Sequence, residues 1–274
     1  MSKTQVQRVV NAIQKFYPIA LADKTWDNTG LLVDSSFEEA TTTASPIKVL
    51  LTIDLTQAVA EEAINKNVKF IMAYHPFIFR GLKSISQQDP QQRSLLKLIQ
   101  NRVSVYSPHT AVDSAQGGVN DYLVDVITKG SIVENKVPLE EDANYPNNGM
   151  GRLVTLQQPQ LLSDLVNRVK SGLKLKHVQV AASNDKQEIK SIAICAGSGG
   201  GVFKGVKADL YFTGELSHHE ALYFKECGSS VICCNHSNTE RAFLAVIQQQ
   251  LTQELEAGDE VVISDEDRDP FETW

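Results

Sequence analysis

Two stretches of the sequence pair a histidine with a carboxylate four residues later. The stretch RVSVYSPHTAVD contains His109 and Asp113, and SSVICCNHSNTE contains His236 and Glu240. In both, an apolar run rich in β-branched residues precedes the histidine, and such a run favours a strand. If the two copies face each other, two imidazoles and two carboxylates converge, which is a ligand set that divalent metal ions bind. The spacing therefore predicts a metal site.

Each carboxylate also has a structural interpretation. Residues 237–240, SNTE, fit the S-x-x-E pattern of a capping box, in which Glu240 bonds to the backbone at the start of a helix. The residues before Asp113, TAV, allow the same interpretation. A capping box requires no histidine four residues before the acid, whereas both copies have one. This coincidence favours metal ligands over caps.

More polar side chains follow other apolar runs. Tyr74 and His75 come directly after VKFIMA, and Glu215 and His218 come after ADLYFT. Ligands of open α/β sheets bind beyond the carboxyl ends of the strands, so His75 is a candidate ligand, although a histidine here can also be a hydrogen-bonded loop residue. For acid or base catalysis the candidates are His109, His218 and Glu215.

The glycine run 197–201 and Trp26 need separate interpretation. GSGGG follows an apolar run but lacks the last glycine of the G-x-G-x-x-G fingerprint, because Val202 stands there. A tight turn and an anion site formed by backbone N–H groups both fit it. Trp26, in WDNTG, lies in a predicted turn, and we expect it to pack in the core or between lobes.

The elements that must position these residues follow a repeated plan. KVLLTID, VKFIMA and RVSVYS are apolar runs in the first half, and KSIAICA, ADLYFT and SSVICC correspond to them in the second. Apolar residues at helical spacing lie between such runs, as in residues 56–65. A duplication of βαβ units implies parallel strands with right-handed crossovers. We predict an α/β fold of two pseudo-repeated lobes with mainly parallel sheets and a metal site in the cleft between them.

The polar segment 131–150 divides the two halves. It contains two prolines and the acidic run EED, which are typical of a boundary. We therefore predict an N-terminal lobe over residues 1–130, a linker over 131–150 and a C-terminal lobe over 151–274. An amphipathic helix is predicted over 5–16, although its surrounding cations Lys3, Arg8 and Lys15 also resemble those of a transit peptide.

Composition limits the class of protein. The 274 residues are 42% hydrophobic and 22% charged, as in a folded globular protein. A net charge of −7 argues against direct nucleic-acid binding, which needs a basic surface. No apolar run has the length of a membrane span. The four cysteines form no C-x-x-C pair, so we expect core thiols in a reducing compartment, the cytoplasm, with the nucleus or the mitochondrion as alternatives.

Several motifs together resemble one protein family. YHPFIFRGLKSI, SPHTAVDSAQGGVND, ADLYFTGELSHHEA and NHSNTE, in this order and spacing, are similar to the Nif-three-like family, the NGG-one-interacting factors, whose bacterial members are labelled GTP cyclohydrolase I type-two homologues. The resemblance covers nearly the whole chain. It implies two related lobes, a dinuclear metal site between them, and homo-oligomers from dimers to ring-shaped hexamers. By position, the family's ligands are His75, Asp113, His236 and Glu240.

One position departs from the family's pattern. Many members have two adjacent histidines where this chain has Tyr74 and His75, so one ligand of one of two ions is missing. The resemblance implies that a first ion binds His75, Asp113 and Glu240, whereas a second ion needs Tyr74 or His109 as a substitute ligand. Mixed imidazole and carboxylate ligands suit Zn, Fe, Mn or Co.

Two classes of function remain open. The first is a metal-dependent hydrolase that acts on a nucleotide-like, cyclic amide or other phosphorylated small molecule, with metal-bound water as the nucleophile. The second is a non-catalytic metal-binding protein that acts by binding a protein partner, a transcriptional coactivator, as the family name suggests. Metal content and metal-dependent turnover distinguish the two classes.

Overall fold

The chain forms two compact units. The computed structural model describes residues 5–36, 46–183 and 188–273, so Lys3 lies outside the described residues. Unit 1 consists of Met1–Val112 and Leu244–Arg268, and unit 2 consists of Asp113–Phe243 and Asp269–Trp274. Unit 1 is therefore made of two chain segments, and most of unit 2 lies between them in the sequence.

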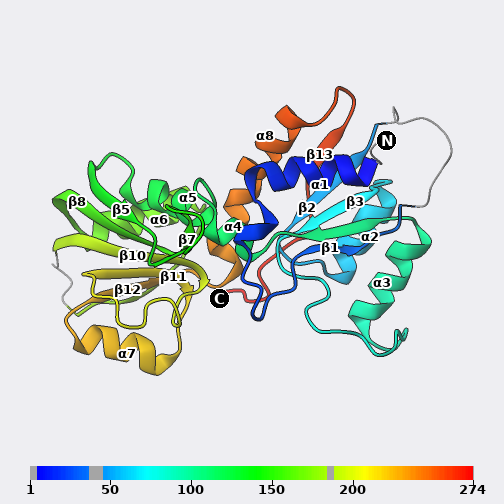
Figure 1. Ribbon diagram of the computed structural model, residues 1–274. Coiled ribbons are helices and arrows are strands. Elements are labelled where there is room, and N and C mark those ends of the chain that lie inside the picture. Colours follow the sequence, from blue (N-terminus) through cyan, green and yellow to red (C-terminus); the bar gives the residue numbers. More distant parts are fainter. Residues whose placement is uncertain (1–4, 37–45, 184–187, 274) are drawn as a thin grey trace. The chain divides into compact units, whose positions relative to one another are not determined.

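Unit 1 is an α/β sandwich around one sheet, with the strand order β1-β4-β3-β2-β13 (Figure 1). Strands β4, β3, β2 and β13 are parallel, and β1 pairs antiparallel with β4. Helices α2 and α3 pack on one face of the sheet, and α1 and α8 lie on the other. The elements are α1 (Gln5–Phe16), η1 (Ile19–Leu21), β1 (Gly30–Val33), β2 (Lys48–Thr52), α2 (Gln57–Asn65), β3 (Phe70–Ala73), α3 (Pro90–Gln100), β4 (Ser104–Ser107), α8 (Leu244–Glu254) and β13 (Glu260–Ile263).

The central strands of unit 1 are apolar because both faces are covered. Residues of β2 and β3 such as Leu50 and Ile71 are fully buried against α2 and α3, and the whole of β3 is buried. A strand buried on both sides needs an uninterrupted apolar run. Thr56 begins α2, with its side chain accepting a hydrogen bond from the Val59 N–H, and Asp89 caps α3 in the same way.

Unit 2 has a mixed sheet in the order β5-β8-β10-β11-β12-β9. Strands β10, β11 and β12 are parallel, and the other neighbours are antiparallel. Helices α5 and α6 cover one face, and α7 covers the other, where Phe224 packs against Tyr211 (Figure 1). The elements are α5 (Val119–Thr128), β5 (Val133–Val137), β6 (Glu140–Glu141), β7 (Gly149–Met150), β8 (Arg152–Leu161), α6 (Leu162–Gly172), β9 (Gln179–Ala181), β10 (Glu188–Ser198), β11 (Leu210–Glu215), α7 (His218–Glu226), β12 (Ser230–Cys233), η2 (Ser237–Thr239) and η3 (Arg241–Phe243). The short helix α4 (Thr110–Ser114) spans the boundary between the units.

The predicted α/β class with its parallel strands is confirmed. Each predicted triplet of apolar runs forms consecutive parallel strands, β2, β3 and β4 in unit 1 and β10, β11 and β12 in unit 2. The division at 131–150 differs from the structure, because this segment is not a linker. Its residues 133–137 form β5, which pairs with β8, and residues 140–141 pair with β7. Polar composition misleads here because β5 is an exposed strand.

The basic N-terminal helix is part of unit 1. Helix α1 buries Val9 and Ile13, and Arg8 forms ion pairs with Glu256 and Asp259 at 2.7 and 2.9 Å. These contacts hold Arg8 within the fold of unit 1. Within the described ranges, no helix combines the length and apolarity that crossing a bilayer requires.

Candidate functional site

The carboxyl end of the sheet in unit 1 holds His75 against a carboxylate. His75 follows β3, and Asp54 follows the neighbouring parallel strand β2, so both side chains leave the same sheet edge. The Nδ1 atom of His75 lies 2.9 Å from Oδ1 of Asp54. A carboxylate at Nδ1 holds the proton on that nitrogen and orients Nε2 as the metal-binding atom. The half-buried His75 thus has the arrangement of a supported metal ligand.

His109 has a similar carboxylate partner, which comes from a different element. Because β1 runs antiparallel to β4 and pairs Gly30 with Ser107, the turn before β1 lies beside the residues after β4. That turn supplies Asp27, whose Oδ1 lies 2.8 Å from Nδ1 of His109. The Asp27 side chain is fully buried, and its other oxygen accepts hydrogen bonds from the hydroxyl and the N–H of Thr110.

The hydrogen bonds of Asp27 lower the pKa of its carboxyl group. Burial alone raises the pKa of Asp27, but the hydrogen bonds from His109, Thr110 and the Asn28 N–H, with the charge of His109, bring it below the usual value. His109 has a left-handed backbone, with φ at 36°, which is uncommon for a residue other than glycine. Its side chain is therefore held both by the backbone and by a buried acceptor.

Unit 2 builds a third pair at the carboxyl ends of its parallel strands. Nδ1 of His236, after β12, lies 2.9 Å from Oε1 of Glu215 at the end of β11. Nε2 of the same ring lies 3.5 Å from Oε1 of Glu240, and Glu240 is 3% exposed. Gly197, at the end of β10, faces both side chains. A Cβ added there would come within 2.8 Å of the His236 Nε2 and 3.0 Å of the Glu240 Oε1.

Asp113 lies in α4 and is buried in unit 2. Burial raises the pKa of the Cys195 thiol, and the negative charges of Asp113, Glu140 and Glu240 raise it further. The negative charges of Asp113 and Glu240 therefore both influence the Cys195 thiol in unit 2. As predicted for core thiols, Cys195, Cys233 and Cys234 are buried, whereas Cys227 is exposed.

The predicted capping box at residues 237–240 and the glycine run 197–201 both lie in unit 2. The 3-10 helix η2 has no side-chain hydrogen bond at its N-cap, His236. A complete capping box is present instead at Ser217 and Glu220, at the start of α7. In the glycine run, a Cβ on Gly199 would lie 2.6 Å from the side chains of Phe203 and Thr213. Glycine is thus required there for close packing.

Other predicted residues lie elsewhere. His218 is exposed in the first turn of α7, in an edge-on contact with His219. Trp26 does not pack in the core, since it is 53% exposed. The prediction missed Asp54 and Asp27. The signal for Asp54 is its place directly after the apolar run KVLLTI, whereas Asp27 could be found only by knowing that β1 lies beside β4.

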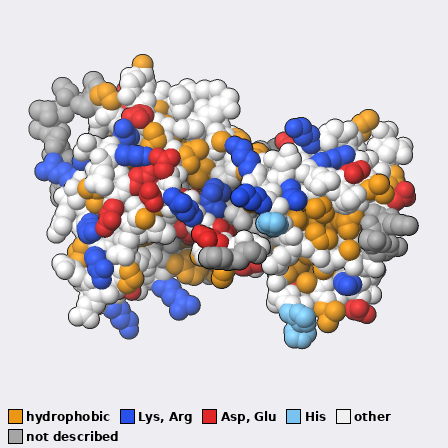
Figure 2. All heavy atoms as spheres, turned by 180° about the vertical axis from the view of Figure 1, so that it is seen from behind, with side chains coloured by type: hydrophobic (Ala, Val, Ile, Leu, Met, Phe, Trp, Pro, Cys, Tyr) orange, Lys and Arg blue, Asp and Glu red, His pale blue; other side chains and the backbone are white. Residues whose placement is uncertain are grey.

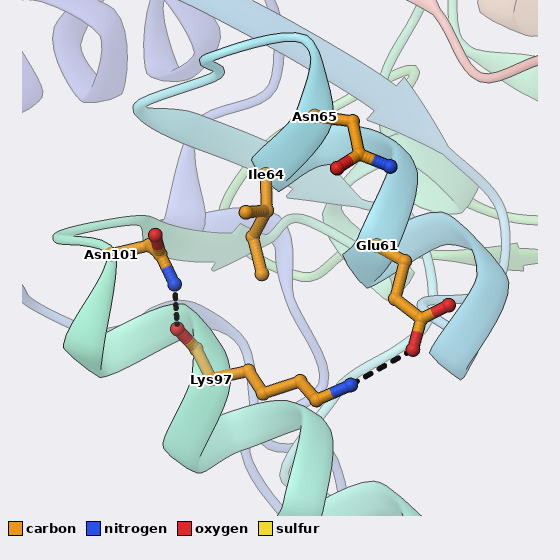
Figure 3. Close-up of a pocket in the computed structure, with 5 residues that line it drawn as sticks. All are labelled: Glu61, Ile64, Asn65, Lys97 and Asn101. Atoms are coloured by element: carbon orange, nitrogen blue, oxygen red, sulfur yellow. Dashed lines mark hydrogen bonds and ion pairs between the residues drawn. The ribbon is translucent and has the colours of Figure 1, made fainter.

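A separate hollow of about 450 Å³ lies between α2 and α3 (Figure 3). Its polar side chains bond to their neighbours, since Lys97 reaches Glu61 at 2.8 Å and the Asn101 amide donates to the Lys97 carbonyl. None of the histidines described above lines it. On the face of unit 1 that Figure 2 shows, acidic and basic side chains are intermingled. The chemistry of the histidines therefore lies apart from this hollow.

The donors of each unit have the chemistry of ligands for a divalent metal ion. Three described side chains with suitable ligand atoms are His75 in unit 1 and His236 and Glu240 in unit 2. Both histidines have a carboxylate at Nδ1, which is the usual support of a metal-bound imidazole. Gly197 keeps space beside the donors of unit 2. Imidazole and carboxylate groups without thiolates suit Zn, Fe, Mn or Co rather than a structural zinc site built of cysteines.

Fold and site together define an α/β protein in which histidine–carboxylate pairs stand at the carboxyl ends of parallel strands in two units. The sequence model of the family Duf34/NIF3 (NGG1p interacting factor 3) matches residues 4–270. The chain belongs to this family.

Relatives support the assignment over the full length. The chain is 47% identical to NGG1-interacting factor 3 of Saccharomyces cerevisiae, covering 99% of this chain and 98% of that protein. It is 48% identical to the protein NIF3 homolog of Schizosaccharomyces pombe, with 100% of each covered. Among solved structures, reduced HcgD from Methanocaldococcus jannaschii has a TM-score of 0.78 at 26% identity, over 94% of this chain and 96% of that one. A Bacillus cereus protein related to NIF3 has the same fold, with a TM-score of 0.79 at 20% identity over 97% and 98%.

Proposed function

We propose that the chain binds a divalent cation through His75, Asp113, His236 and Glu240 and uses it to hydrolyse a small nucleotide-like, cyclic amide or phosphorylated molecule. The observation that carries this proposal is the repeated support of a histidine by a carboxylate, at 2.9 Å in both His75–Asp54 and His236–Glu215. Structural histidines do not need such a partner, whereas metal-binding histidines almost always have one.

The chain's own residues have distinct roles in this proposal. Asp54 and Glu215 hold the two imidazoles in the tautomer that presents Nε2. When bound, a divalent cation polarises the bond to be hydrolysed and lowers the pKa of water. His109 is the favoured acid or base, because Asp27 fixes its ring through Nδ1. Glu215 is already bonded to His236, and His218 is on an exposed helix turn, so both are weaker candidates.

Metal analysis of the purified protein tests the proposal. We expect bound Zn, Fe, Mn or Co at one or two ions per chain, and its loss in His75→Ala and in Glu240→Ala. His177→Ala is the matched control, since His177 is exposed and outside the site. If both site variants retain the metal content of the wild type, the ligand assignment is wrong. If metal is bound but phosphoesters, nucleotides and cyclic amides show no metal-dependent turnover, the hydrolase proposal fails.

A second candidate function is a non-catalytic interaction protein. The name of the Saccharomyces cerevisiae relative says that it interacts with NGG1, and at 47% identity this suggests a related protein partner, a transcriptional coactivator, for this chain. Pull-down of the homologous coactivator by the wild type, and by the metal-free Glu240→Ala variant, distinguishes the two functions. Partner binding without turnover favours this second candidate. The family resemblance also suggests a homo-oligomer between dimer and hexamer in the cytoplasm, which sedimentation and imaging can measure.

A further inference from the structure

Two exposed aromatic side chains lie beside each other in unit 1. Trp26, before β1, is 53% exposed, and Phe79, after β3, is 45% exposed. Their ring centroids are 6.2 Å apart. The amide of Asn28 donates to the carbonyl of Ile78, so the two loops that carry the rings are tied together. We call Trp26 and Phe79 the aromatic platform.

The indole of the aromatic platform is fixed, and among the residues that the structure describes no ring stacks face to face on it. Its Nε1–H donates to Oδ2 of Asp23 at 2.7 Å, which fixes its orientation. Phe79 is inclined to the indole by 52°, and the imidazole of His109 by 88°. A covered pair in the same chain looks different, since Tyr211 and Phe224 stack at 3.9 Å and 24°. Large aromatic side chains that stay half exposed at a rigid position are typical of binding surfaces.

The aromatic platform continues into the candidate site. From Trp26 the next ring is His109, at 5.8 Å between centroids, and from His109 the next is His75, at 5.5 Å. A molecule that lay on the indole and extended toward His109 would have its other end beside the two histidines. Cations are also present in the two loops, since Lys24 and Arg80 are both exposed. An occupant with a flat ring and an anionic group would complement both features.

We propose that Trp26, with Phe79 beside it, binds the planar heteroaromatic ring of a nucleotide-like molecule and so places its remainder at His75 and His109. The proposal rests on the proposed function and adds the residues that recognise the substrate. Bases stack on aromatic side chains with little regard to sequence, because every base has a π face. Trp26 is therefore a specificity-determining residue for ring-bearing substrates rather than a residue that performs the chemistry.

Intrinsic fluorescence provides a direct test, because the sequence has only two tryptophans, Trp26 and Trp274. In a Trp274→Phe background, we titrate the full-length, metal-loaded protein with the four nucleoside monophosphates and with ribose 5-phosphate, which lacks a ring. We expect saturable quenching by nucleotides and none by ribose 5-phosphate. Calorimetric Kd values for nucleotides should weaken about tenfold in Trp26→Ala and stay near the starting value in Trp26→Phe. Tyr223→Ala, at an exposed aromatic residue of unit 2, is the matched control.

Several results would overturn the proposal. They are the absence of saturable binding by any nucleotide, equal binding of ribose 5-phosphate, and an unchanged Kd in Trp26→Ala. An unchanged Kd together with weakened self-association in sedimentation would assign the surface to a second copy of the chain instead. Metal content measured on the same samples separates the two proposals. Nucleotide binding that depends on Trp26 in a protein that holds no metal would support the aromatic platform and refute the metal site.

Discussion

Arg152 is a buried cation whose removal should destabilise unit 2 strongly. Its side chain is 2% exposed, and all five N–H groups of the guanidinium donate hydrogen bonds. Two go to the carboxylate of Asp121, both at 3.0 Å. The other three go to the carbonyl oxygens of Gly149, Gly151 and Ala115, at 2.7, 2.7 and 3.1 Å. The ion pair therefore also connects two backbone segments, one at Ala115 and one at Gly149–Gly151.

The loss of stability in Arg152→Met depends on which hydrogen-bond partners Asp121 and the three carbonyl groups keep. In Arg152→Met, three carbonyl groups each lose a donor, although the Ala115 carbonyl keeps the Gly118 N–H at 2.9 Å. Asp121 keeps Lys136 at 2.7 Å and the Gly117 N–H at 2.8 Å. Breaking a buried ion pair costs about 3–5 kcal/mol when the remaining charge has no partner, so we expect about 3 kcal/mol. For a unit of this size, this lowers the Tm by roughly 6–12 °C.

Urea and thermal unfolding followed by circular dichroism measure the effect. Arg268→Met is the control with the same chemical change, because Arg268 is 73% exposed and pairs with Glu266 only at 3.8 Å. It should change the free energy of unfolding by less than about 0.5 kcal/mol. In the double variant Asp121→Asn with Arg152→Met, the two losses should not add. If Arg152→Met is as stable as the Arg268→Met control, the reasoning is refuted.

The same pair predicts a pH dependence. Burial alone raises the pKa of Asp121, but hydrogen bonds and charge from Arg152 and Lys136 bring it below the usual value. A carboxyl with a depressed pKa in the folded state stabilises the protein above its unfolded pKa, and this contribution is lost as the pH falls through the folded pKa. The stability difference between wild type and Arg152→Met should be full at pH 7 and decrease below about pH 4. A difference that does not change with pH would contradict the assignment to Asp121.

Other predictions concern the site. Asp54→Ala should weaken metal binding about 10- to 100-fold without unfolding the chain, measured by competition with a chelator, and unchanged affinity would refute its orienting role. Gly197→Ala should lower the metal content, because the added Cβ would meet His236. It should also lower the free energy of unfolding by about 1–2 kcal/mol, because the φ of Gly197 is +64°. A variant that retains both its metal and its stability would contradict this prediction. Asp27→Ala should cost about 1–3 kcal/mol in urea unfolding, because buried donors of His109 and Thr110 lose their acceptor. Wild-type stability in this variant would show that these bonds contribute nothing. Tyr74→His should raise the number of bound ions per chain, and equal stoichiometry would refute the role of this position.

The parallel strands could be predicted because their pattern is local. Strands buried on both faces, such as β3 and β12, have sequences that are short continuous apolar runs. The exposed strand β5 has the sequence VENKV and no such run, so polar composition suggested a linker. The division into units could not be predicted from the sequence either. Residues 244–268 belong to unit 1 because β13 pairs with β2, and no local sequence pattern indicates this long-range pairing.

The positions of the candidate histidines could be predicted to the extent that they follow strand ends. His75, His109 and His236 each follow an apolar run, so their place at a sheet edge could be inferred. Their partners depend on which strands are neighbours. Asp27 reaches His109 because β1 pairs with β4, and the two lie more than 70 residues apart in sequence. The role of Glu215 toward His236 likewise depends on the pairing of β11 with β12.

The split composition of unit 1 has a consequence for biosynthesis. Strand β2 pairs with β13, and Lys48 lies opposite Glu260, so the ribosome must add more than 200 residues before this edge of β2 is covered. At a synthesis rate of about 5–20 residues per second, this edge of β2 stays uncovered in the nascent chain for roughly 10–40 s. During that time an apolar strand exposes unpaired N–H and C=O groups, which can template aggregation. Proteins that end before β13 should therefore depend on chaperones, even though nearly every residue of unit 2 has already been made.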